Sequence, residues 1–359
     1  MALTRLAVGH SLSVPAADID LPALKALAEE QGLLAVVLDG YEKYRAHSPG
    51  NGISTHSKEL GVTILLAQWI GEVSQLYEQR YEQYIHAISD LAAFYNSHGF
   101  KMMVLKGFAC SLDWPKPEHR PCGDIDIWLF GQQKEADAVL TREKGIEIDT
   151  SHHHHTVFDW QGFMVENHYD FINVHHHKSH AKLEAIFKGL GADDTHTVEV
   201  NGERVYLPSP NLHALFLLKH NALHFSTGEM TLRQLLDWGF FVERHGKEVD
   251  WKWLDEILEQ YGMKPIYGII NAICVEELGF CAEIFSYVQF EPGLKKRVLN
   301  DIFAPKFGDS LPPKMFPRLL YKYRRWKANE WKHELCYKES MWSAFWSGVW
   351  NHLLKPSSI

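Results

Sequence analysis

Two aspartates separated by one residue are the side chains of this sequence best suited to chemistry. Asp124 and Asp126 lie in Gly123-Asp-Ile-Asp-Ile127, within an apolar run (residues 120–130) that is rich in β-formers and predicts a strand. Alternate strand residues share a face, so both carboxylates would project from one side, about 7 Å apart. Buried neighbouring carboxylates repel each other and lose hydration, and a bound cation relieves both costs. The pair predicts a cation site, and the alternative is two solvated aspartates at a sheet edge.

A strand-to-helix turn and a second acidic strand accompany this pair. Residues 101–105 predict a short strand that ends at Lys106-Gly107 and leads into a helix. Residues 163–169 predict a later strand that carries Glu166, and His168 lies two residues further along on the same face. Asp159 and Asp170 are the competing candidates for a third acid.

The remaining pattern is helical, then mixed, then helical again. Apolar spacing predicts helices at 21–30, 62–97, 133–143, 211–224, 231–244, 251–261 and 265–278. Short strands are expected at 146–148, 156–160, 197–200 and 204–207, with hairpin turns at Gln161-Gly162 and Asn201-Gly202. We therefore expect an α/β (α+β) core with a small mixed sheet of about five strands at 100–208. Helical regions at 1–99 and 209–359 would flank it.

Composition narrows the class of protein. Hydrophobic residues form 46% and charged residues 23% of the 359 residues, as in soluble globular proteins. The net charge of −9 argues against general DNA binding, which needs a broad basic surface. We expect no membrane span, because no run of about 18 apolar residues occurs. Five scattered cysteines without C-x-x-C spacing favour a reducing compartment, so we expect a cytoplasmic protein.

The order of these motifs resembles the nucleotidyltransferase superfamily typified by DNA polymerase beta, over residues 100–170. There, a glycine-containing strand-to-helix turn holds the triphosphate, an Asp-x-Asp pair binds magnesium, and a third acid on a neighbouring strand completes the site. The sequence is most similar to the bacterial uncharacterised nucleotidyltransferases, which have a Lys-Gly turn, an Arg before Asp-Ile-Asp, and an acid-x-His strand. The matching residues here are Lys106-Gly107, Arg120, Gly123-Asp124-Ile125-Asp126 and Glu166-Asn167-His168, with a weaker match at Arg233 and Asp237.

The resemblance implies transfer of a nucleoside monophosphate from an NTP, such as ATP, to an acceptor, with release of pyrophosphate. It implies two Mg²⁺ ions, with Asp126 or Glu166 accepting the proton of the attacking hydroxyl. The acceptor is left open between a small molecule, an RNA and a protein. The implied metal ligands are Asp124, Asp126 and Glu166, and the implied phosphate-binding residues are Lys106, Gly107, Arg120, Gly123 and His168. One departure is that Lys-Gly replaces the superfamily's usual Gly-Ser or Gly-Gly, so a lysine charge stands where a serine hydroxyl would touch phosphate.

Histidines are abundant, 22 in all, with consecutive runs at 152–155 and 175–177. Consecutive strand residues alternate faces and do not naturally supply three ligands, so we expect most of these histidines to be polar loop residues near the cleft. His213, His220 and His224 share one helical face, and we expect them to be structural.

Two further segments carry less specific signals. Arg233 and Asp237 lie four apart on a predicted helix, which favours a surface salt bridge, with a cleft-lining role as the alternative. Residues 318–327 mix aromatic and basic side chains, and we expect a helix docked on the domain. Binding to single-stranded RNA or to a membrane surface is the alternative there.

Two other functions remain open. A catalytically weak or inactive nucleotide-binding or regulatory module would be consistent with the Lys-Gly departure. A metallohydrolase would instead use the two histidine runs at 152–155 and 175–177.

Overall fold

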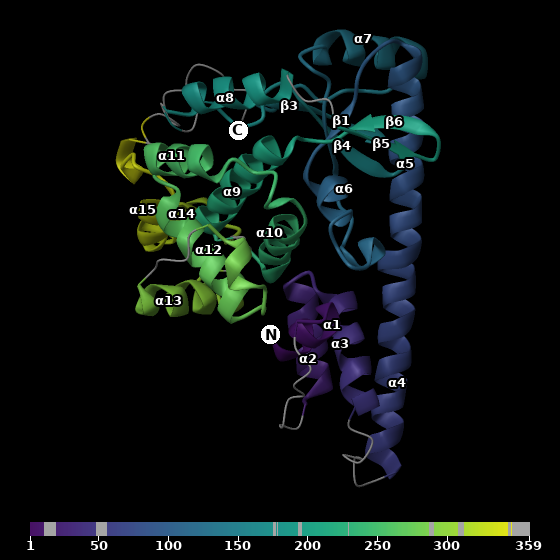
Figure 1. Ribbon diagram of the computed structural model, residues 1–359, viewed down its shortest axis with the longest axis vertical. Helices are drawn as coiled ribbons and strands as arrows, with labels where there is room; N and C mark the ends of the chain where they lie inside the picture. The colour runs from purple at the N-terminus through teal and green to yellow at the C-terminus, as the bar shows by residue number, and fades with distance from the viewer. Residues whose placement is uncertain are drawn as a thin grey trace.

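The computed structural model describes residues 1–10, 19–47, 56–174, 177, 179–192, 196–228, 230–286, 291–307, 312–343 and 346. Along its length runs a helical rod that reaches from the N-terminal helices to the sheet (Figure 1). Apolar spacing predicts one helix over 62–97, and the structure confirms it, although a π-helical turn interrupts the regular α-helix. The rod consists of α4 (His56–Val73), η1 (Ser74–Glu78) and α5 (Gln79–Ser97).

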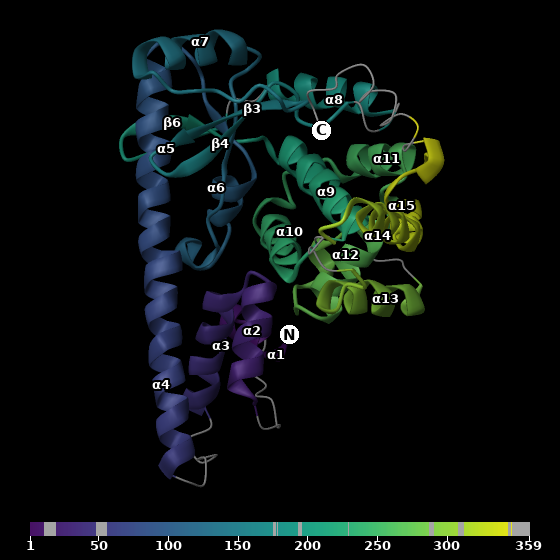
Figure 2. The ribbon, with the colours of Figure 1, turned by 180° about the vertical axis from the view of Figure 1, so that it is seen from behind.

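Three short helices pack beside the lower half of the rod (Figures 1 and 2). They are α1 (Ala2–Val8), α2 (Leu21–Glu30) and α3 (Leu34–His47). The start of α2 follows from local chemistry, because the Asp20 carboxylate accepts a hydrogen bond from the Ala23 amide at 3.1 Å and Pro22 occupies the first turn. The helix predicted at 21–30 is therefore confirmed.

The sheet has six strands in the order β3-β4-β2-β1-β6-β5. Both predicted hairpin turns are confirmed, since Gln161, Gly162, Asn201 and Gly202 all have positive φ, as a two-residue turn of type I′ requires. The strand predicted at 146–148 is wrong, because only Asp149 bridges to Val157 there. The strands are β1 (Met103–Val104), β2 (Ile125–Trp128), β3 (His155–Trp160), β4 (Phe163–His168), β5 (Thr197–Val200) and β6 (Glu203–Tyr206).

The two faces of the sheet differ in character. On one face, Ile125, Ile127 and Val165 share a hydrophobic core with Tyr84 and Ile88 of α5. The upper half of the rod therefore covers this face of the sheet. The alternate residues of β2 and β4 point to the opposite face, where the polar side chains gather.

The remaining helices lie between the strands and after the sheet in the chain. Those between the strands are α6 (Lys106–Ser111), η2 (Pro117–His119), α7 (Gln133–Lys144) and α8 (His180–Ala192). Those after the sheet are α9 (Pro210–Thr227), α10 (Leu232–His245), α11 (Trp251–Tyr261), α12 (Lys264–Glu276), η3 (Ala282–Ile284), α13 (Pro292–Phe303), α14 (Met315–Ala328) and α15 (Glu330–Cys336). None of the helices in the described part of the chain is long and apolar enough to span a membrane. The domain boundaries at 99/100 and 208/209 stay predictions.

Helix α14 contains the basic and aromatic segment at 318–327, for which we expect docking on the domain. It has no buried residue and contacts α9 through Arg325, which donates to the Thr227 carbonyl at 2.8 Å, whereas α15 buries Lys332, His333 and Cys336. Met315 is 79% and Phe316 77% exposed. Docking of the C-terminal segment is therefore carried by α15.

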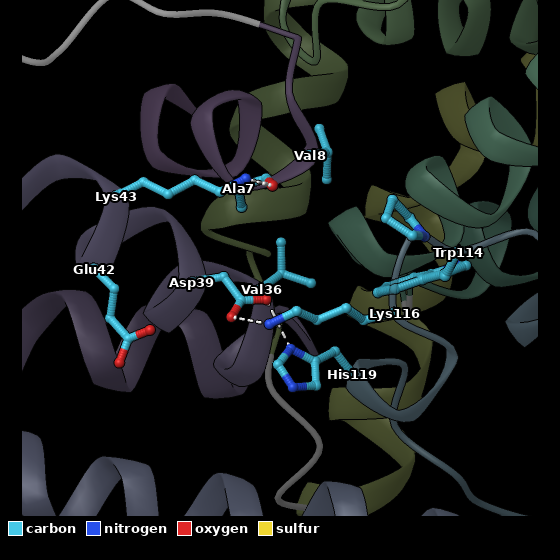
Figure 3. A pocket seen from close by; sticks show the side chains of 10 residues that line it. Ala7, Val8, Val36, Asp39, Glu42, Lys43, Trp114, Lys116 and His119 are labelled. Atoms are coloured by element: carbon cyan, nitrogen blue, oxygen red, sulfur yellow. Dashed lines mark hydrogen bonds and ion pairs between the residues drawn. The ribbon is translucent and has the colours of Figure 1, made fainter. Parts of the chain in front are cut away.

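A cavity of about 330 Å³ lies where α1 and α3 meet the loop before η2 (Figure 3). Asp39 of α3 accepts from Lys116 Nζ and from His119 Nδ1, both at 2.7 Å, and the other ring nitrogen of His119 lies 3.3 Å from Glu78 of η1. These bonds join the N-terminal helices, the rod and the core. Burial alone would lower the pKa of His119, but the bond to Asp39 outweighs it and the pKa is raised.

This network predicts a pH-dependent stability. The raised pKa of His119 means that its contribution is complete below about pH 6.5 and is lost as the pH rises through the folded-state pKa. We expect the free energy of unfolding to fall by about 1–2 kcal/mol between pH 6 and pH 9 on this account. Chemical denaturation of the protein and of His119→Asn would measure it. The variant should show a smaller decrease, and an identical pH profile for both proteins would refute the prediction.

Candidate active site

The register of two parallel strands brings the predicted acids together. In β2 and β4, Asp126 pairs with Glu166, and Trp128 pairs with His168. Paired residues of adjacent strands point to the same face, so the side chains of Asp126, Glu166 and His168 converge on the face away from α5. Their ligand atoms all lie within 4.8 Å of one another. The competing acids are engaged elsewhere, since Asp159 accepts from the Gly162 amide at 3.2 Å and Asp170 pairs with Lys188.

Asp126 lies at the centre of this group and is almost fully buried. Its Oδ1 atom is 2.6 Å from Lys106 Nζ and 3.0 Å from His168 Nε2. His168 Nε2 is also 3.5 Å from Glu166 Oε2. His168 therefore lies between the two carboxylates, and Lys106 pairs with Asp126.

The Lys106-Gly107 turn has a conformation that explains both residue types. Lys106 has φ of +35°, in the left-handed region that side chains avoid, so the surrounding contacts hold it there at some cost. At Gly107, an added Cβ would lie only 2.7 Å from the Tyr84 hydroxyl. That hydroxyl donates to the Asp124 carbonyl at 2.9 Å. The absence of a side chain at Gly107 leaves room for the Tyr84 hydroxyl, whose hydrogen bond fixes the chain just before β2.

Asp124 and Gly123 lie at the edge of the group. Asp124 precedes β2 rather than lying in it, and its carboxylate is outside the set of described ligand atoms within 4.8 Å of Asp126, Glu166 and His168. Gly123 is exposed, and an added Cβ would meet nothing within 4 Å, so local space does not explain a glycine there. Both remain predicted site residues by position.

The charges of the site influence one another strongly. Burial opposes ionisation of Asp126, but Lys106 and His168 outweigh burial and hold the pKa of this carboxyl below its ordinary value. Burial likewise opposes the charge of Lys106, yet the surrounding acids raise its pKa. Burial, and then repulsion by Asp126, raise the pKa of Asp124. At neutral pH the centre of the site is therefore an ion pair between Lys106 and Asp126.

Arg120 does not face these carboxylates. Its Nε and Nη2 atoms donate to the two carboxylate oxygens of Asp237 at 2.8 and 3.0 Å, and both side chains are buried. Trp114 Nε1 donates to the same carboxylate at 2.9 Å. The expected surface salt bridge between Arg233 and Asp237 is therefore wrong, because Asp237 is buried and pairs with Arg120. In the structure Arg120 joins the loop before β2 to α10, and phosphate binding by Arg120 stays a prediction.

Two histidines lie at the border of the site, although the sequence predicts a loop for them. His155 is the first residue of β3 and pairs in register with His168, which places its Nδ1 3.9 Å from Glu166 Oε2. His154 Nε2 lies 3.2 Å from His155 Nδ1. The sequence does indicate the position of His155. Residues that pair across a two-residue hairpin are equally distant from the turn, and His155 and His168 are equally distant from Gln161-Gly162.

Helix α9 contributes to the surroundings of the same face. Lys106 Nζ lies 5.8 Å from the centre of the Phe216 ring. Burial, and then the nearby charge of Lys106, keep the pKa of His220 well below its usual value. His213 is placed elsewhere, 3.6 Å from Cys110 Sγ and against Phe241, as expected of a structural histidine. His220 of α9 is thus close enough to the site to be influenced by the charge of Lys106.

The second histidine run does not join the first in the described residues. His175 and His176 lie outside them, and His177 interacts with Glu339 and stacks on Tyr337. A metal site built from both runs therefore receives no support from the placement of His177.

The donor set fits magnesium. Mg²⁺ prefers oxygen ligands and retains several waters, so two or three carboxylates suffice. Asp126 and Glu166 supply oxygens on adjacent strands, and the structure already balances them with the positive charge of Lys106. The cavity of Figure 3 contains none of these residues in its lining.

The mixed sheet presents the Asp-x-Asp segment beside an acid on the neighbouring strand, which is the arrangement that the resemblance to nucleotidyltransferases implies. The sequence profile of the uncharacterised nucleotidyltransferase family matches residues 17–279, and this chain belongs to that family. Membership ties it to nucleotidyl transfer as a class of reaction. An antigenic nucleotidyltransferase-like protein from Paracoccidioides brasiliensis, known from a crystal structure, is 13% identical, with 45% of this chain and 77% of that chain covered and a TM-score of 0.34. No curated protein matches the sequence.

The Lys106–Asp126 pair predicts an exchange between lysine and metal. Removing the ammonium in Lys106→Met leaves buried carboxylates uncompensated, so without divalent metal we expect a loss of about 3 kcal/mol in the free energy of unfolding. Magnesium should then raise the melting temperature of the variant more than that of the parent protein. Melting curves in EDTA and in excess MgCl₂ measure this, with the exposed Lys134→Met as the matched control. An equal magnesium effect on all three proteins would contradict it.

The Arg120–Asp237 pair predicts a structural role that is separable from phosphate binding. Arg120→Met should cost about 3–5 kcal/mol, because it leaves the buried Asp237 without its cation. The double variant Arg120→Met/Asp237→Leu should recover most of this loss, since no buried charge remains. Denaturation measures stability, and calorimetry measures NTP affinity. Intact stability combined with lost NTP binding in the double variant would instead assign Arg120 to phosphate binding.

Proposed function

We propose that this protein is a magnesium-dependent nucleotidyltransferase that moves a nucleoside monophosphate from an NTP to a hydroxyl acceptor. The observation that carries the proposal is the in-register pairing of Asp126 with Glu166 across β2 and β4, with Lys106 beside them. Family membership supplies the class of reaction. Asp124, Asp126 and Glu166 are the proposed metal ligands.

The proposed reaction follows from the donors that the site offers. The acceptor oxygen forms a bond to the α-phosphorus of the NTP, and the bond from that phosphorus to the bridging oxygen breaks. Pyrophosphate leaves with the electron pair, and the acceptor's proton passes to a carboxylate, Glu166 or Asp126. Bound magnesium supplies charge stabilisation for the attacking and leaving oxygens.

Lys106 and His168 have supporting roles in this proposal. The Lys106 ammonium contacts Asp126 without nucleotide and is near enough to transfer its charge to a phosphate oxygen when the carboxylate takes up a cation. His168 contacts both Asp126 and Glu166 and so holds their orientation. Lys106 would then fill the place of the serine that the superfamily places in this turn.

A non-catalytic nucleotide-binding module is the second candidate. The observation in its favour is the same ion pair, because at 2.6 Å the Lys106 ammonium satisfies Asp126 without any metal. Such a module would bind an NTP in the absence of magnesium and release no pyrophosphate.

Replacing the acids tests the enzyme proposal. Even residues that only orient metal ligands cost 10–100-fold when removed, so Asp126→Asn and Glu166→Gln should each lower the rate of pyrophosphate release by at least about 100-fold. The assay contains labelled NTPs, magnesium and acceptors of three classes: small alcohols and sugars, RNA with a free 3′ hydroxyl, and protein.

Asp159→Asn is the matched control, because Asp159 is an exposed acid of the neighbouring strand β3 and should leave the rate unchanged. Pyrophosphate release that persists at the parental rate in Asp126→Asn would sink the proposal. Magnesium-independent NTP binding by calorimetry, with no turnover for any acceptor, would favour the module.

A further inference from the structure

Strand β3 places imidazoles directly beside the carboxylate pair. His155 pairs with His168, and Val157 pairs with Glu166, in the antiparallel ladder between β3 and β4. The ligand atoms of His154, His155 and His168 lie within 4.8 Å of one another, as do those of Asp126, Glu166 and His168. The two groups share His168, so the carboxylate site continues into a nitrogen-rich site without a break.

The distances in the nitrogen-rich group approach those of a coordination shell. Zinc–nitrogen bonds of about 2.0–2.1 Å place the ligands of a tetrahedral ion roughly 3.3 Å apart. His154 Nε2 and His155 Nδ1 are 3.2 Å apart, and Glu166 Oε2 lies 3.5 Å from His168 Nε2 and 3.9 Å from His155 Nδ1. The three imidazoles form one group, and Glu166 lies at its border.

Hydrogen bonds to the backbone orient the ring of His168 and fix the chain at His154. The Nδ1 of His168 donates to the Asp170 carbonyl at 3.2 Å, which directs Nε2 toward the group. The His154 carbonyl accepts from the Tyr169 and Asp170 amides, both at 3.1 Å, which fixes the chain just before β3. A ring nitrogen bonded to a backbone carbonyl is the usual support of a metal-binding histidine.

We infer that His154, His155 and His168 form a site for a borderline divalent transition-metal ion, of the kind represented by Zn²⁺, Mn²⁺ and Co²⁺. Three imidazoles suit such ions, whereas Mg²⁺ prefers oxygen donors. The site adjoins the proposed magnesium site, because His168 also lies beside Asp126 and Glu166, so two ions bound together would differ in kind. The inference concerns the same face of the sheet as the proposed function, but the binding of the ion does not require nucleotidyl transfer.

A cobalt titration without nucleotide tests this inference. Untagged, chelator-treated protein is titrated with Co²⁺ while the visible absorption is recorded, because a four-coordinate site rich in nitrogen gives intense bands and an octahedral aqueous-like site gives weak ones. We expect one equivalent of Co²⁺ with intense bands, displaced by Zn²⁺ but not by excess Mg²⁺. His154→Asn and His155→Asn should each weaken the affinity by at least about 100-fold.

His86→Asn is the matched control, since His86 is an exposed histidine on α5, away from the cluster, and its loss should change nothing. If His155→Asn does not fold, as judged by circular dichroism, the partly exposed His154 still provides the decisive variant. Weak bands, or binding that is unaffected by either cluster variant, would mean an adventitious ion only and would overturn the inference.

The two proposals fail separately. If the cluster variants lose cobalt binding and the parent protein releases no pyrophosphate, the metal site is supported and the enzyme proposal is rejected. Pyrophosphate release without specific cobalt binding does the reverse.

Discussion

The parallel pairing of β2 with β4 is the constraint on which the rest of the site depends. Because Asp126 lies opposite Glu166, two carboxylates share one buried face and cannot move apart without breaking the ladder. Two unit charges about 4 Å apart repel by about 4 kcal/mol at an effective dielectric constant of 20, a large fraction of the stability of a domain. The fold must therefore supply positive charge at this place, and Lys106 and His168 supply it.

The rod supports the turn that carries Lys106. The lysine reaches Asp126 from a left-handed backbone conformation, which persists only where neighbouring contacts enforce it. Tyr84 on α5 provides one of these contacts, since its hydroxyl occupies the space beside Gly107 and binds the backbone at Asp124. The helix is thus part of the support of the site as well as a cover for the apolar face.

Much of this arrangement could be predicted from local pattern. Hairpin turns at Gln161-Gly162 and Asn201-Gly202 have a defined backbone, and strand alternation fixes which residues share a face, so the facing of Glu166 and His168 followed from counting. The same counting places His155 opposite His168, whereas the strand predicted at 156–160 begins one residue later. The strand predicted at 146–148 is wrong because a short apolar run needs a partner strand, and here only the adjacent Asp149 forms a bridge, to Val157.

Contacts between residues far apart in the chain could not be predicted from the sequence. Arg120 and Asp237 are separated by 117 residues, and no local spacing indicates that they meet. The spacing of Arg233 and Asp237 suggested a helical pair instead, which was plausible for an exposed helix but not for one whose aspartate is buried. The approach of His220 to the site depends in the same way on how α9 packs against the sheet.

The order of strands in the sheet also determines when the site comes into existence. Between Asp126 and Glu166 the chain must complete α7, return through β3 and turn at Gln161-Gly162 before β4 can align beside β2. Contacts between such distant segments form late, because the intervening loop must be closed first. A nascent chain therefore keeps Asp126 and Glu166 apart until β4 has left the ribosome and paired with β2.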